Sequence, residues 1–165
     1  MRGDLEDRVR RRARRARLRA FSFADWCLLV EAGLFVAGAM AAIAFLPFKH
    51  VGRLASRRAE GASPPLDPLF AVRIRWAVEA VARRMPLRAK CFECGLAAQW
   101  MLQRRGYAPT LFYGATMKGA SPLAAHVWVR ADQLDIVGCD NAPDFTVLAC
   151  FPGARAQTSL PALMR

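Results

Sequence analysis

The chain has 165 residues, of which 55% are hydrophobic, and its formal net charge is +12. This length is sufficient to bury a core, so we expect one modest domain with an appendage rather than a chain too short to fold alone. The five cysteines are an odd number, which argues against a disulfide framework and favours a reducing, cytoplasmic compartment.

Residues 1–20 form an arginine-rich tail that holds nine arginines against Asp4, Glu6 and Asp7. A solvated tail is the simplest interpretation, and a tail that binds nucleic acid or anionic lipid is the more specific alternative. No aromatic residue interrupts these positions, so nothing there offers a stacking surface for bases. We therefore expect no nucleic-acid partner.

Residues 21–62 are predicted to form an N-terminal helical segment. Within it, residues 32–48 carry no charge over 17 positions, the lower limit for a membrane span. Three interpretations compete: a buried helix packed on the following domain, a peripheral membrane helix over residues 21–48, and a true span. The span is the weakest, because Asp25 and Glu31 shorten the apolar run and both flanks are basic.

Three prolines forbid a continuous helix over residues 61–68, which we interpret as the joint before the main domain. Residues 69–85 return to helical spacing. One face of this predicted helix is formed by Val72, Trp76, Ala77, Ala80 and Val81.

The next predicted helix begins at Cys91 and ends before Gly106, because Phe92, Leu96 and Trp100 recur every fourth residue. Cys91 then lies at or just before the first turn. Unpaired backbone N–H groups and the helix dipole favour a thiolate there. Cys91 is therefore a candidate nucleophile, although core packing is the common role of a cysteine in an apolar helix.

The rest of the chain has β-type patterns, with strands predicted at residues 110–113, around His126, at 135–137 after a tight turn, and within 144–151. A helix followed by an antiparallel sheet predicts an α+β fold. A thiol at a helix start and an imidazole on a strand are the two groups that thiolate acyl transfer needs. A purely structural role for His126 is the alternative.

Cys94 forms a Cys-x-x-Cys motif with Cys91. A zinc site would need a second close pair, but Cys139 and Cys150 are eleven residues apart. A redox pair would follow a strand, and no strand is predicted before Cys91. We interpret Cys94 as a buried thiol, keep a thiol-disulfide oxidoreductase as a minor alternative, and expect neither a metal nor a cofactor.

Four stretches in this order resemble one family: Cys-Phe-x-x-Gly-Leu-Ala from Cys91, Leu-Gln-Arg-Arg-Gly ending at Gly106, Pro-Thr-Leu-Phe-Tyr-Gly ending at Gly114, and Ala-His-Val-Trp-Val around His126. The resemblance is to the leader peptidase of lasso-peptide biosynthesis, a transglutaminase-like cysteine protease. It implies a papain/transglutaminase-like core, which we assign to residues 69–165. It also favours the buried-helix interpretation of the N-terminal segment.

The resemblance implies that Cys91 and His126 are catalytic and that an aspartate follows the histidine strand. The expected position falls near Gly138, which has no side chain to orient an imidazole. Asp140 lies two residues later and would face the same way on a strand, so we choose it as the third catalytic residue. Asp132 and Asp135 are the alternatives.

The resemblance also implies the substrate and the partners. The substrate would be a ribosomally made precursor peptide, and the partners a separate small leader-recognition protein and an ATP-dependent lasso cyclase. A non-catalytic binding or scaffold protein on the same fold is the main alternative, because the aspartate is missing from its expected position.

Overall fold

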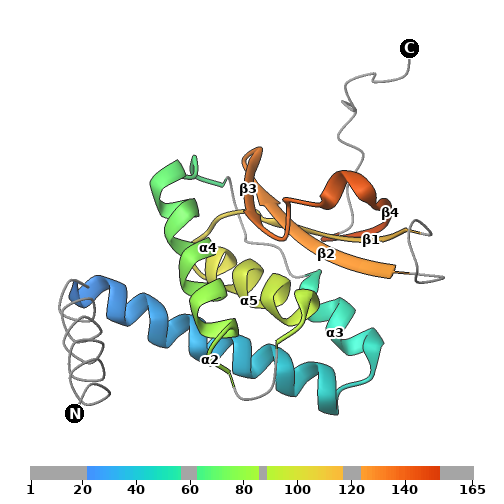
Figure 1. Cartoon of the computed structure of the whole chain (residues 1–165), viewed down its shortest axis with the longest axis horizontal. Helices are drawn as coiled ribbons and strands as arrows, with labels where there is room; N and C mark the ends of the chain where they lie inside the picture. The colour runs from blue at the N-terminus through green and yellow to red at the C-terminus, as the bar shows by residue number, and fades with distance from the viewer. Residues whose placement is uncertain (1–21, 57–62, 86–88, 117–123, 153–165) are drawn as a thin grey trace, which may run out of the picture.

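The computed structural model of the protein describes residues 22–56, 63–85, 89–116 and 124–152, so the predicted arginine-rich tail lies outside the described residues. Helices come first, then a sheet (Figure 1). The helices are α2 (Phe23–Phe45), α3 (Phe48–Ala55), α4 (Pro68–Ala82) and α5 (Cys91–Gln103). The strands are β1 (Thr110–Thr116), β2 (Ala124–Ala131), β3 (Leu134–Val137) and β4 (Thr146–Phe151), with a short 3-10 helix, η1 (Ala142–Asp144), before β4. The predicted α+β fold is confirmed.

The four strands form one antiparallel sheet in the order β3-β2-β1-β4. His126 of β2 lies opposite Gly114 of β1. The turn between β2 and β3 holds Asp132 and Gln133 at positive φ, 51° and 66°, a conformation that suits a tight hairpin. The tight turn predicted at these two residues is thus confirmed.

Helix α5 lies between the sheet and α2, and it is buried over most of its circumference (Figure 1). It comes close to the sheet at Gly95, where an added Cβ would lie only 2.7 Å from Cγ1 of Val127. A single apolar face was predicted for this helix. The structure instead buries consecutive positions, because layers cover the helix on both sides: Gly95, Leu96, Ala97, Ala98, Gln99, Met101 and Leu102.

The buried amide of Gln99 ties two other elements to α5. Its Nε2 donates hydrogen bonds to the carbonyl oxygen of Ala55, at 2.9 Å, and to that of Phe151, at 2.8 Å. Both acceptors lie at the ends of their elements, α3 and β4. Burial of a polar amide is costly unless it is hydrogen-bonded. These contacts satisfy the amide nitrogen of Gln99, which is 0% exposed, whereas its Oε1 has no hydrogen-bond partner within the described part of the chain.

Helix α2 begins with a capping box, in which the Ser22 hydroxyl and the Asp25 carboxylate bond to each other's backbone N–H groups. Its inner residues are buried in the same hydrophobic core as α4, α5 and the sheet: Leu28, Ala32, Val36 and Ala39. The inner face of α2 therefore fits the buried-helix interpretation. Its outer face is exposed and is treated below.

The predicted apolar face of residues 69–85 is wrong at Val72, which is 64% exposed. Helix α4 packs against α2, α5 and β3, and small residues let these elements come close. The buried side is therefore rotated from the predicted one and consists of Ala71, Ile74, Ala77, Val78 and Ala80.

Replacing Gly95 by Ala should lower the free energy of unfolding by about 1–3 kcal/mol, because the added methyl group overlaps Val127 and forces the helix and sheet apart. Gly33 of α2 is the matched control, since nothing lies within 4 Å of a Cβ added there. G33A should raise the free energy of unfolding by up to about 1 kcal/mol, because alanine favours a helix more than glycine does. Urea denaturation of the two variants measures both changes. Equal stability of G95A and the wild type would contradict the tight crossing.

Candidate active site

Cys91 is the first residue of α5 and is half-buried. The N-cap residue, Lys90, is extended (φ −85°, ψ 175°) and makes no side-chain hydrogen bond to the helix. The N–H groups of the first turn therefore have no side-chain cap, and the positive end of the helix dipole faces outward beside the thiol. This placement agrees with the prediction that Cys91 lies at the helix start.

His126 is held in an aromatic environment on β2. Its ring centroid lies 6.1 Å from that of Trp128 and 5.0 Å from that of Phe145. Its Nε2 atom lies 2.7 Å from the carbonyl oxygen of Gly138. Because a carbonyl oxygen only accepts hydrogen bonds, Nε2 carries the proton, and Nδ1 is the basic nitrogen of the neutral ring.

Only a glycine fits at position 138, because there is no space for a side chain there. Its φ is +74°, and an added Cβ would lie 2.5 Å from the carbonyl oxygen of Val127 and 3.4 Å from Nε2 of His126. The sequence interpretation that Gly138 cannot orient an imidazole is corrected here. It considered only the side chain, whereas the backbone carbonyl makes the contact.

The three acids considered for the third catalytic position each have another partner. The carboxylate of Asp140 pairs with Arg75 of α4 at 2.5 Å. Asp132 accepts a hydrogen bond from the backbone N–H of Leu66 at 2.8 Å, and Asp135 pairs with Arg130 at 2.7 Å. In the described residues, the imidazole is hydrogen-bonded to Gly138 and not to any of these acids. The role of Asp140 stays a prediction.

The contact between Gly95 and Val127 shows how Cys91 and His126 lie relative to the sheet. Gly95 lies one turn after Cys91, and Val127 directly follows His126. Because side chains alternate along β2 and Val127 faces α5, His126 and Trp128 lie on the opposite face of the sheet, away from α5. Within the described ranges, the thiol and the imidazole are not hydrogen-bonded to each other. The sulfur–nitrogen contact required for catalysis therefore stays a prediction.

Cys94 has the character of a buried thiol. Burial raises its pKa to about 11, and the nearby Glu93, Cys91 and Glu79 add to the effect. Across the ranges that the structure describes, no three His, Cys, Asp or Glu side chains are grouped so as to hold a metal ion. This part of the chain thus gives the Cys-x-x-Cys motif no further metal ligands.

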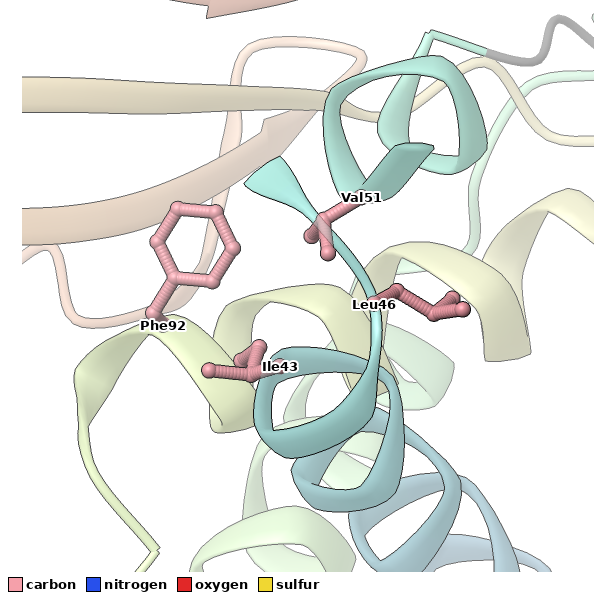
Figure 2. A pocket seen from close by; sticks show the side chains of 4 residues that line it. All are labelled: Ile43, Leu46, Val51 and Phe92. Carbon is pink, nitrogen blue, oxygen red and sulfur yellow. The ribbon is translucent and has the colours of Figure 1, made fainter. Parts of the chain in front are cut away.

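A small apolar cavity of ≈ 240 Å³ adjoins the start of α5. Figure 2 shows its lining side chains, which come from α2, α3, α5 and the α2–α3 turn: Ile43, Leu46, Val51 and Phe92. Phe92 directly follows the candidate nucleophile in the chain. The cavity could accept one apolar side chain of a molecule bound at Cys91.

Residues 34–150 match the family model of the transglutaminase-like superfamily. The matched region is well over half of the chain and contains Cys91, His126, Gly138 and Asp140. No curated protein and no solved structure gives a significant match.

The buried thiol leads to a labelling prediction. With a pKa of about 11, only about one Cys94 in a thousand is a thiolate at about pH 8. We expect iodoacetamide to leave Cys94 unmodified in the folded protein and to label it after denaturation. Peptide mass spectrometry measures this, with the exposed Cys27 as the internal control. Labelling of Cys94 at the rate of Cys27 would contradict its burial.

Proposed function

The chain belongs to the transglutaminase-like superfamily, and from this premise we propose that it is a cysteine peptidase that removes the leader from a ribosomally made lasso-peptide precursor. The observation that carries the proposal is the position of Cys91 at the uncapped start of α5, the central helix of the fold. The lasso-peptide substrate rests on the sequence resemblance around Cys91 and His126.

In the proposed reaction, the Cys91 sulfur attacks the carbonyl carbon of the scissile peptide bond. Nδ1 of His126 takes the thiol proton and then gives it to the leaving amine as the C–N bond breaks. Water next attacks the thioester carbonyl and loses a proton to Nδ1. The C–S bond then breaks, Nδ1 returns the proton to the sulfur, and the leader leaves as a carboxylate. These steps require Nδ1 within hydrogen-bond reach of the sulfur. Because His126 lies on the face of the sheet opposite α5, the proposal requires the imidazole to move toward Cys91 when the substrate binds.

The carbonyl of Gly138 takes the orienting role in this proposal. It fixes the proton on Nε2, and so leaves Nδ1 free to act as the base. The rings of Trp128 and Phe145 restrict rotation of the imidazole. A neutral carbonyl stabilises an imidazolium less than a carboxylate does. Like a carboxylate at the same place, however, it holds the proton of the neutral ring on Nε2.

The first-turn N–H groups of α5 are the proposed oxyanion site. They point out of the helix start beside Cys91, where the N-cap residue, Lys90, makes no side-chain hydrogen bond to the helix. Donors held in place before the reaction stabilise the negative oxygen of the tetrahedral intermediate without reorganisation. The apolar cavity beside Phe92 would then hold an apolar side chain of the precursor near the cut.

The proposed partners follow from the same resemblance. A separate small protein would recognise the leader, and an ATP-dependent cyclase would use the freed core N-terminus. The second candidate function is a non-catalytic scaffold on this fold. It is favoured by one observation, that the imidazole is hydrogen-bonded to Gly138 rather than to the Cys91 thiol in the described structure.

Replacing Cys91 or His126 by Ala should reduce leader cleavage by at least about 10³-fold, because each variant removes a group that makes or breaks bonds. Cleavage of the cognate precursor is followed by mass spectrometry with the leader-recognition protein present. Cys94 and His50 provide matched controls, because neither has a role in the reaction; C94A and H50A should retain activity. Full cleavage by C91A would refute the peptidase and leave the scaffold.

Replacing Asp140 by Asn decides between the two orienting groups. If the Gly138 carbonyl orients His126, D140N loses only its ion pair with Arg75, and kcat should change by less than about threefold. A fall of about 10⁴-fold in kcat would instead assign the orienting role to Asp140. Circular dichroism and the melting temperature confirm that the variant is folded.

A further inference from the structure

The two faces of α2 differ sharply in exposure. The inner face is buried, as described above, whereas large apolar side chains on the outer face are open to solvent: Phe23 (84% exposed), Trp26 (43%), Val30 (60%), Leu34 (70%) and Phe45 (84%). The positions between them on this face are small or apolar as well: Cys27, Ala37, Gly38 and Ala41. The result is an apolar outer face that runs along the whole helix, a length of about 34 Å.

Both charged side chains of α2 are held against the protein. Asp25 pairs with Arg73 of α4 at 2.8 Å. Glu31, whose side chain is 12% exposed, pairs with Arg105, just after α5, at 2.6 Å and with Arg104 at 3.5 Å. The outer face therefore carries no charge along its length.

Two further large apolar side chains are exposed on α4. Leu69 is 74% exposed and Val72 is 64% exposed. Val72 lines a shallow pocket together with Asp25 and Arg73, which places this part of α4 beside the start of α2. An apolar face along the whole of α2 is unusual for the free surface of a water-soluble domain and indicates that something covers it.

We infer that α2 docks the protein in the plane of an anionic lipid bilayer, with its outer face among the lipid chains. The charges of the chain favour a membrane over a protein partner. Residues 1–20, directly before α2, hold nine arginines against three acids, and the exposed Lys49 and Arg53 follow the helix. Basic residues near an anionic bilayer each contribute about 1 kcal/mol to binding, and apolar side chains supply the insertion.

The contacts of α2 also decide its orientation. The helix is long and apolar enough to cross a bilayer. Crossing would, however, withdraw Leu28 and Val36 from the core and break the pairs of Glu31 with Arg104 and Arg105. Lying in the interface keeps every one of these contacts. Phe23 and Trp26 at one end and Phe45 at the other are side chains suited to the lipid–water boundary.

The test uses the full-length protein and sedimentation with vesicles. We expect binding to vesicles of phosphatidylcholine mixed with phosphatidylglycerol, binding at least about tenfold weaker to phosphatidylcholine alone, and weakening by high salt. The protein should be released from the vesicles by alkaline carbonate. No binding of the wild-type protein to the anionic vesicles would overturn the inference, and resistance to carbonate would show a span instead.

A double variant tests the outer face itself. V30E/L34E should bind anionic vesicles at least about tenfold more weakly, because two carboxylates would enter the lipid region. L148E is the matched control, since Leu148 is 62% exposed but lies on β4. Binding by V30E/L34E equal to that of L148E would overturn the inference. A second outcome would also overturn it: the wild-type protein forms a dimer and does not bind vesicles, and V30E/L34E is a monomer. In that case α2 pairs with a second copy of the chain.

Discussion

The crossing of α5 over β2 is the contact on which the other features of this protein depend. At Gly95 the helix backbone lies so close to Val127 that no larger residue fits without displacement. Small residues on α5 allow the helix to be covered by the sheet on one side and by α2 on the other. The crossing therefore determines where the Cys91 end of the helix lies relative to the sheet. It also determines how α2 lies against the domain.

The candidate site shows how a backbone group can take a position where a carboxylate was expected. The carbonyl of Gly138 lies 2.7 Å from Nε2 of His126, and the glycine is required there by its positive φ and by the close carbonyl of Val127. Asp140, which follows two residues later, is drawn to Arg75 of α4. The same short segment thus contacts the imidazole through its backbone and α4 through a side chain.

Helix α2 serves the fold with one face and leaves the other free. Asp25 pairs with Arg73 of α4, and Glu31 pairs with Arg105, just after α5, so both acids fasten α2 to the domain and leave its outer face uncharged. An amphipathic helix normally exposes its polar side. Here the polar side chains face inward, and this reversal distinguishes a docking helix from an ordinary surface helix.

Much of the fold was predictable from the sequence. The spacing from Cys91 gave a helix that begins at this residue, and the alternation around His126 gave a strand, because both patterns reflect local backbone geometry. The α+β order and the turn before residues 135–137 were also predictable from the sequence. The tertiary structure alone decided which residues of α4 are buried, that a backbone carbonyl contacts His126, and that Asp140 pairs with Arg75. Burial and pairing depend on elements distant in the chain, and every residue carries the same carbonyl, so no sequence pattern reveals which one an imidazole will meet.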